Sequence, residues 1–214
     1  DLGDNIQFGN SLVSQTELNG ISGANRQMME IAPFDWSTIN NGCGFDVIIG
    51  NPPYVNTEGM HALLPSAEVE IYKKKYKTSH KQFDKYFIFI EQAINKINEN
   101  GLVCYIVPNK FFKIGAGEKL RNLIAKERML VSLDDFGDAQ LFEDKTIYSS
   151  IILLSKAKQT SFVYSSVDSA NKLWAGEEVS SIELNSSVLN KLPWRLTTDF
   201  EFLTMLQRLD EVSV

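Results

Sequence analysis

The sequence predicts an α/β fold built on a parallel sheet whose last strands form an antiparallel edge. Phe45–Gly50 and residues 102–107 are nearly continuous apolar runs, as in strands that are covered on both faces. Between these two runs, apolar residues recur every three to four positions from Phe83 onward, which is the period of an amphipathic helix. Strands that alternate with helices in this way favour a parallel sheet.

Shorter elements complete the expected order of the chain. Asn100-Gly101 is expected to end the helix that begins near Phe83, because glycine commonly follows a helix C-terminus. The other expected elements are a strand at residues 5–9, a helix at residues 25–31, a helix at residues 117–128, and strands at residues 129–133 and 148–154. A polar loop separates the last two strands.

The chain divides into one main domain and an extension. With 214 residues, of which 43% are hydrophobic, it can bury one sizeable core. After about Lys158 the sequence becomes rich in Ser, Asn and Thr and ends in an amphipathic helix at residues 198–209. We therefore expect a main domain at residues 1–158 and a connector toward a further domain at residues 159–214.

Composition excludes several classes of protein. No apolar run reaches the ~20 residues of a membrane span, and the first residues lack the features of a signal peptide, so we expect a cytoplasmic protein without membrane contact. Cys43 and Cys104 have no C-x-x-C spacing, which argues against zinc and disulfides, and we expect no metal. The formal net charge of -6 argues against indiscriminate coating of nucleic acid.

One short stretch is strongly basic in spite of this acidic total. Aromatic residues interrupt it at Tyr72, Tyr76 and Phe83. Its candidate contacts to nucleic acid are Lys73, Lys74, Lys75, Lys77 and Lys81. A solvated helix face would show the same composition. The position of the stretch, shortly after residue 54, favours a binding role.

The turn at residues 51–54 carries most of the chemical information. Pro52 and Pro53 directly follow a buried strand, at the edge where open α/β sheets bind ligands. Prolines have no N–H, so carbonyl acceptors are in excess there, while Asn51 adds a side-chain oxygen and Tyr54 a flat ring. This combination suits a planar group that bears an NH2. A simple turn that closes the strand is the alternative.

From this turn the chain resembles the gamma-type amino-methyltransferases of DNA, in particular fused restriction-modification and phage-defence enzymes. Their motif is Asn-Pro-Pro-Tyr after a Phe-Asp-Val-Ile-Ile-Gly strand, often preceded by Phe-Asp-Trp, which stands here at residues 34–36. The resemblance covers roughly residues 5–156 and includes similar segments at residues 84–89, 101–112 and 140–143. It implies a Rossmann-like methyltransferase fold that depends on S-adenosylmethionine.

The resemblance also implies the roles of individual residues. Asn51 and the Pro52 carbonyl would accept hydrogen bonds from the N6 amino group of an adenine flipped out of double-stranded DNA. Tyr54 and Phe142 would hold the adenine ring, each stack contributing ~1–3 kcal/mol. Phe142 stands in a polar loop, where an aromatic residue has little structural reason to be. The implied function is site-specific adenine methylation within a restriction-modification system.

For the cofactor, the resemblance implies contacts from Asn10 and Phe89. Asn10 follows Phe8-Gly9 and would accept a hydrogen bond from the amino group of the cofactor's adenine, where many relatives carry Asp. Phe89 would lie against that adenine. The periodicity around Phe89 suits a position in the core equally well.

The cofactor loop of this family has no good match in the chain. Such a loop is a Gly-x-Gly turn after an early strand, followed by an acidic residue at the end of the next strand. Gly42-Cys43-Gly44 precedes its strand, and Gly115-Ala116-Gly117 has no acidic residue at the required place. We expect a fragment of a longer enzyme that binds S-adenosylmethionine weakly or not at all. The incomplete sheet would have a displaced N-terminal segment or form a homodimer through its exposed edge.

Three alternatives remain. Asn-Pro-Pro-Tyr also serves enzymes that methylate RNA or a protein glutamine, because the motif recognises any planar amide or amino group. Within DNA, cytosine N4 is a lesser alternative, since Asn51 favours adenine. A catalytically idle DNA-binding fragment is the non-enzymatic alternative, and the missing cofactor loop supports it.

Overall fold

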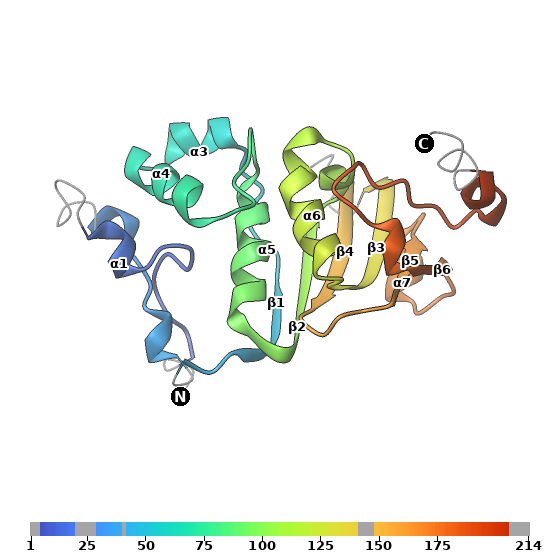
Figure 1. Cartoon of the computed structure of the whole chain (residues 1–214), viewed down its shortest axis with the longest axis horizontal. Coiled ribbons are helices and arrows are strands. Elements are labelled where there is room, and N and C mark those ends of the chain that lie inside the picture. Colours follow the sequence, from blue (N-terminus) through green and yellow to red (C-terminus); the bar gives the residue numbers. More distant parts are fainter. Residues whose placement is uncertain (1–4, 20–28, 40–41, 141–147, 206–214) are drawn as a thin grey trace.

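The computed structural model describes residues 5–19, 29–39, 42–140 and 148–205 of the chain. A six-stranded mixed sheet forms its centre, with the strand order β1-β2-β4-β3-β5-β6 (Figure 1). The strands are β1 (Phe45–Gly50), β2 (Ile97–Pro108), β3 (Leu130–Gln140), β4 (Tyr148–Ser155), β5 (Ser161–Ser166) and β6 (Ser180–Asn185). Strands β1, β2, β3 and β5 run in one direction, and β4 and β6 run in the other. The predicted α/β fold with antiparallel edge strands is confirmed.

The helices form two groups. Helices α5 (Lys85–Lys96) and α6 (Glu118–Lys126) lie along the sheet, whereas the short helices near the N-terminus form a lobe beside β1 (Figure 1). This lobe contains α1 (Gln15–Leu18), α3 (Thr57–Leu63) and α4 (Ser66–Lys75). The remaining elements are α7 (Ala170–Trp174) and the 3-10 helices η2 (Trp36–Thr38), η4 (Asn109–Phe112), η5 (Gly115–Gly117) and η6 (Ser186–Val188).

Helix α5 provides much of the core. Its apolar face is fully buried at Tyr86, Phe87 and Ile90. The predicted helix is confirmed, but it ends at Lys96 rather than at Asn100-Gly101. Residues 97–101 are already extended and belong to β2, so the predicted C-terminus was four residues too late.

A close approach of β1 to β2 explains this early end. The two strands pair in parallel from Val47↔Leu102 to Gly50↔Tyr105, and a bulge separates this run from Phe45↔Ile97. A Cβ on Gly101 would lie 2.6 Å from both the Phe45 carbonyl oxygen and the Ile97 Cβ. Glycine is therefore required at 101 for strand packing, and the sequence signal was attributed to the wrong element.

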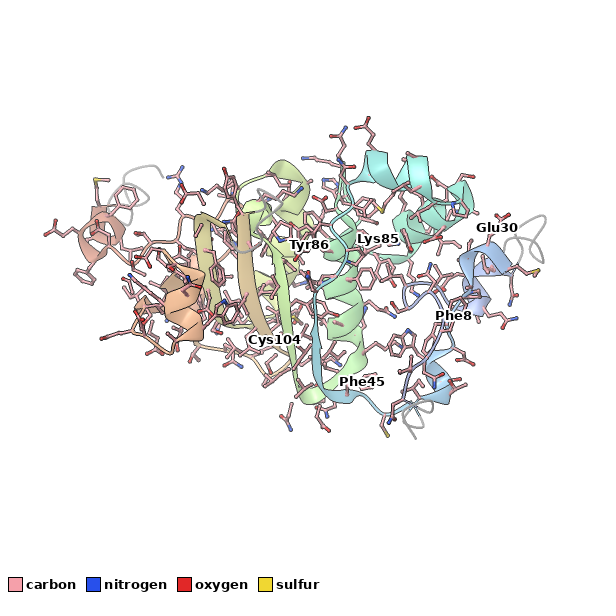
Figure 2. The ribbon with its side chains drawn as sticks, turned by 180° about the vertical axis from the view of Figure 1, so that it is seen from behind. Phe8, Glu30, Phe45, Lys85, Tyr86 and Cys104 are labelled. Carbon is pink, nitrogen blue, oxygen red and sulfur yellow. The ribbon has the colours of Figure 1, made fainter. Side chains whose placement is uncertain are left out.

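The face of β1 that carries Val47 and Ile49, and the outer edge of β1, stay open within the described chain. On β1, Ile48 is partly buried against the core, whereas Val47 and Ile49 are 51% and 78% exposed. The view from behind shows no described helix over this part of β1 and β2 (Figure 2). Parallel strands are normally covered on both faces, so this apolar edge is unusual. The homodimer expected through it stays a prediction.

The strand predicted at residues 5–9 is wrong. This segment is exposed and lies outside the sheet, with Ile6 74% and Phe8 91% accessible. The chain instead pairs locally at Asn10↔Pro33, where the Asn10 N–H donates to the Ala32 carbonyl at 2.6 Å. The N-terminal segment is thus displaced from the sheet, which is one of the two expected alternatives. Of the helix predicted at residues 25–31, residues 29–31 are helical and the rest lie outside the described residues.

The sheet continues beyond residue 158. Strands β5 and β6 pair with each other, and β5 pairs in parallel with β3. Phe162 and Tyr164 of β5 and Leu184 of β6 are buried. These strands were not predicted, and the boundary expected at residue 158 does not coincide with an edge of the sheet. The connector role of residues 159–214 stays a prediction.

Replacing Gly101 by Ala is expected to lower the free energy of unfolding by about 1–3 kcal/mol, because the added methyl group overpacks the β1–β2 junction. Denaturant unfolding of the purified protein measures the change. Gly115→Ala is the matched control, since the nearest atom to a Cβ there is the Lys81 Nζ at 3.8 Å. Equal stability of the two variants would contradict the packing argument.

Candidate active site at the end of strand β1

The turn at residues 51–54 lies at the carboxyl edge of the sheet. Strands β1 and β2 both end there, and Gly50 packs against the Tyr105 ring, where a Cβ would lie 3.1 Å from Tyr105 Cε1. Asn51 and Pro53 are exposed, while Pro52 is buried and anchors the turn. This edge is where open α/β sheets bind their ligands.

The Tyr54 hydroxyl connects the turn to β2. It donates toward the Asn51 Oδ1 and toward the Ile106 carbonyl, the latter at 2.9 Å. A phenol has one proton, so these two oxygens share one donor. Burial raises the pKa of Tyr54 to about 12, and the hydroxyl therefore stays a neutral donor at physiological pH. The contact orients the Asn51 side chain and leaves that oxygen a second lone pair.

Aromatic packing fixes the Tyr54 ring from the other side. Its centroid lies 6.0 Å from that of Tyr86, at an edge-to-face angle of 82°. Tyr86 is fully buried and donates from its own hydroxyl to the Pro108 carbonyl at 3.2 Å. Tyr54 itself is partly exposed, so part of the ring remains accessible beside Asn51.

An ion pair closes the segment that follows the turn. Asn56 forms a bridge with Asp84, and the Lys85 N–H donates to the Val55 carbonyl at 2.8 Å. The buried Asp84 carboxylate pairs with Lys110 Nζ at 2.9 Å. The first residues of α5 therefore bind the backbone at residues 55 and 56, and the ion pair to Lys110 connects them to the 3-10 helix η4.

The structure brings Asn10 and Phe89 to the same face of α5. Lys85, Phe89 and Gln92 are spaced by four and three residues and share one helix face. Gln92 donates to the Ser11 carbonyl at 3.0 Å, next to Asn10. Phe89 is partly buried against the core, so the geometry is compatible with both roles considered for it.

Asn10 already forms a small polar network. Its Nδ2 donates to Glu68 at 3.0 Å and to the Tyr72 hydroxyl at 3.2 Å, while its Oδ1 accepts from the Leu12 N–H at 3.1 Å. These contacts fix the orientation of the amide. A carbonyl oxygen has two lone pairs, and Leu12 uses one of them.

Phe142 lies outside the described residues. The backbone on either side of its loop is described, with Gln140 paired to Tyr148 and Ser149 paired to Pro108. Both pairs lie at the carboxyl edge of β2, near residues 51–54. The stacking role of Phe142 stays a prediction.

The basic stretch divides into exposed and engaged lysines. Lys73, Lys74, Lys77 and Lys81 are exposed, although Lys73 pairs with Glu70 at 3.1 Å and Lys81 with Glu118 at 3.9 Å. Lys75 is turned inward, where its Nζ contacts Glu17 and the Leu12 carbonyl, both at 3.0 Å. A phosphate contact from Lys75 would first have to break these two interactions.

In each glycine pair considered for a cofactor loop, the second glycine has a packing role. A Cβ on Gly44 would lie 2.5 Å from the Asn98 backbone nitrogen, and one on Gly117 would lie 2.3 Å from the Phe111 carbonyl oxygen. Gly44 and Gly117 therefore need no cofactor to explain them, because strand and loop packing already requires glycine at these two positions. In the described part of the chain, no cluster of three metal-ligating side chains is found and no helix is long and apolar enough to cross a membrane.

Sequence reasoning missed an oriented amide on the next strand end. Asn109 follows β2 as Asn51 follows β1, and its Nδ2 donates to Asp135 at 2.8 Å and to the Gly137 carbonyl at 3.1 Å. Pro108-Asn109 after an apolar run was an available signal, since it repeats the proline and asparagine chemistry of the first turn.

Comparison with known proteins identifies the family. A model described as Eco57I restriction-modification methylase matches residues 4–142. The chain belongs to this family. It is 39% identical over 199 residues to the type II restriction enzyme and methyltransferase RM.Eco57I of Escherichia coli, covering 89% of the chain and 19% of that protein. It is 27% identical to the type II methyltransferase M.XhoI of Xanthomonas vasicola, covering 78% of the chain and 33% of that protein.

Solved structures show the same fold. A DrdV–DNA complex matches 91% of the chain and 22% of its own chain, with a TM-score of 0.59 and 16% identity. A modification subunit of a type I restriction enzyme from Vibrio vulnificus matches 78% of the chain and 41% of its own, with a TM-score of 0.53 and 12% identity. The Rossmann-like methyltransferase fold is thereby confirmed. The chain spans only a fifth to a third of the two curated relatives.

We expect the Tyr54 phenol to make the free energy of unfolding decrease as the pH rises into the alkaline range. Its folded pKa of about 12 exceeds the ordinary value near 10, so its contribution is full below pH 10 and is lost as the pH rises through about 12. The difference in unfolding free energy between the wild type and Tyr54→Phe should be constant from pH 6 to 9 and should shrink above pH 10. Denaturant titrations at each pH measure it. A difference that grows above pH 10 would contradict the burial of a neutral phenol.

Proposed function

We propose that the chain is the catalytic part of a site-specific DNA methyltransferase that transfers a methyl group from S-adenosylmethionine to the N6 amino group of a flipped adenine. The enzyme would act in a restriction-modification system. Membership of the Eco57I methylase family supports the reaction class. The observation that carries the proposal is the exposed Asn51 side chain, oriented by Tyr54 at the carboxyl edge of the sheet.

The turn supplies acceptors where an amino group needs them. The Asn51 Oδ1 and the Pro52 carbonyl would each accept one hydrogen from the adenine N6. With both hydrogens engaged, the nitrogen lone pair is directed toward the methyl donor. Catalysis then consists of positioning and acceptor geometry. The Tyr54 contact to Asn51 limits rotation of the amide before the base arrives.

S-adenosylmethionine would supply an activated methyl group as a sulfonium. Asn10 and Phe89 would hold its adenine, and their common side of α5 supports this assignment. The remaining lone pair of the Asn10 Oδ1 is the acceptor for the adenine amino group. We assign no Gly-x-Gly cofactor loop and no ribose-binding residue to the described part of the chain, because Gly44 and Gly117 are explained by packing. Weak cofactor binding by the isolated chain stays our expectation.

The base and the duplex would be held by separate groups. Tyr54 and Phe142 would stack on the flipped adenine, which offsets part of the cost of unstacking. Of the basic stretch, the exposed Lys73, Lys74, Lys77 and Lys81 are the phosphate contacts that we propose. Lys75 is left out because its ammonium is engaged inside the protein.

We further propose that residues 159–214 lead toward a separate target-recognition domain, which would read the DNA sequence. Methylation of RNA or of a protein glutamine is the alternative for an Asn-Pro-Pro-Tyr turn. The family match to restriction-modification methylases favours DNA.

Asn51→Ala in the full-length protein is expected to lower methyl incorporation by roughly 100-fold or more, because the amino group loses a positioned acceptor. Transfer of tritiated methyl groups to duplex DNA measures the rate, and mass spectrometry of the digested DNA separates N6-methyladenine from N4-methylcytosine. Asn95→Ala is the matched control, since Asn95 is exposed on α5 away from the turn.

Parallel reactions with RNA and with a release factor test the alternative substrates. Incorporation into either of them, but not into DNA, would replace the proposed substrate. Unchanged methylation by Asn51→Ala would show that the turn is not catalytic and would favour the idle fragment.

A further inference from the structure

Trp194 and Phe111 connect the C-terminal part of the chain to the candidate active site. The Trp194 ring lies 5.7 Å from Phe111, edge to face, and 5.9 Å from Phe112, stacked at 26°. The backbone N–H of Trp194 also donates to the Phe112 carbonyl at 2.9 Å. Trp194 is 4% exposed, so it is as buried as the core although it stands near the end of the described chain.

From Phe111 the contacts continue to residue 54. The Phe111 ring lies 6.4 Å from Tyr86, and the Tyr86 ring lies 6.0 Å from Tyr54. Trp194, Phe111, Tyr86 and Tyr54 thus form a continuous aromatic series, with every centroid separation inside the range of favourable ring contacts. Phe111 and Tyr86 are fully buried, and a close-packed interior transmits strain from one ring to the next.

Arg121 stabilises the end of this series at Trp194 and Phe111. It is 2% exposed, and its guanidinium donates to four backbone carbonyls. Two belong to the C-terminal segment, Lys191 at 3.1 Å and Leu192 at 2.9 Å, and two to the segment after β2, Phe111 at 2.6 Å and Ile114 at 2.8 Å. Because the buried guanidinium donates hydrogen bonds to both segments, it holds them next to each other.

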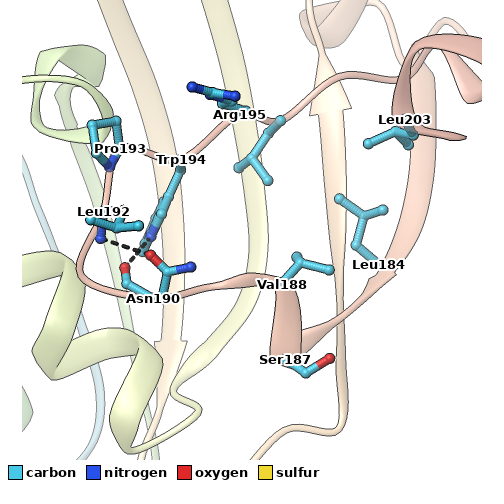
Figure 3. Close-up of a pocket in the computed structure, with 10 residues that line it drawn as sticks. Leu184, Ser187, Val188, Asn190, Leu192, Pro193, Trp194, Arg195 and Leu203 are labelled. Carbon is cyan, nitrogen blue, oxygen red and sulfur yellow. Dashed lines mark hydrogen bonds between the residues drawn. The ribbon is translucent and has the colours of Figure 1, made fainter. Parts of the chain in front are cut away.

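The segment at Trp194 is itself preorganised. The Trp194 indole N–H donates to the Asn190 carbonyl at 2.9 Å, and the Leu192 N–H donates to the Asn190 side chain at 2.7 Å. Both hydrogen bonds are drawn in Figure 3. Its local geometry is therefore held by hydrogen bonds of its own, in addition to its packing on Phe112. If this segment were displaced, it would move as a unit, and the Trp194 ring would displace Phe111.

We infer that Trp194, held by Arg121, is a positioning residue for the Asn51–Tyr54 turn. It braces Phe111 and Tyr86, and so sets where the Tyr54 ring and hydroxyl lie. The C-terminal segment that leads onward from the fold would thereby adjust the active site. This inference rests on the proposed methyl transfer, and it goes beyond that proposal by assigning a role to residues distant from the reacting atoms.

The first test separates turnover from DNA binding in the full-length enzyme. Trp194→Leu is expected to lower kcat about tenfold or more with little change in KM for duplex DNA, since small misplacements of a reacting group are costly while phosphate contacts are untouched. Trp194→Phe should restore most of the rate. Trp174→Leu is the matched control, because Trp174 is 64% exposed on α7. A folded Trp194→Leu enzyme with wild-type kcat would overturn the inference.

The second test needs no activity. With 5-fluorotryptophan incorporated, Tyr54→Leu should move the fluorine resonance of Trp194 and leave that of Trp174 in place, because coupling through packed rings acts in both directions. An unmoved Trp194 resonance would overturn the inference even if Trp194→Leu failed to fold. If the wild-type enzyme placed no methyl group on DNA adenine, the proposed function would fail, and the fluorine result would still decide whether Trp194 and Tyr54 are coupled.

Discussion

The parallel pairing of β1 with β2 is the constraint on which the candidate site depends. Four successive pairs, from Val47↔Leu102 to Gly50↔Tyr105, bring the end of β1 beside Tyr105 and Ile106. Only in this register does the Tyr54 hydroxyl reach the Ile106 carbonyl. A slip of one residue would turn Ile48 away from the core and would remove that acceptor. The orientation of Asn51 is thus a consequence of strand register.

Charged groups near the site are buried with partners. Asp84 is paired with Lys110 behind residue 55, and Glu68 accepts from Asn10 and lies 3.6 Å from Lys85. Breaking such pairs leaves a buried charge unpaired, which is far more costly than the pair itself is stabilising. The polar contacts therefore define one arrangement of the lobe, α5 and η4. Burial of apolar side chains alone would be compatible with several arrangements of these elements.

Local patterns predicted the middle of the chain well and its ends poorly. Strand β1, helix α5 and strand β2 were predicted because their apolar periodicity is strong and their neighbours in sequence are their neighbours in space. Residues 5–9 show a similar pattern but pair with no strand of the sheet in the described chain. Strand β5 was missed because serines dominate it, although Phe162 and Tyr164 alternate as a half-buried strand requires.

The sequence by itself determined the fold class, the turn chemistry of residues 51–54 and the resemblance to amino-methyltransferases, because these depend on residue types at fixed spacing. Only the tertiary structure decided which groups meet. It turned Lys75 inward, placed Phe89 on the side of Asn10, and joined Trp194 to Phe111. Contacts between residues far apart in the chain follow from packing and from the satisfaction of buried polar groups, and no local pattern records them.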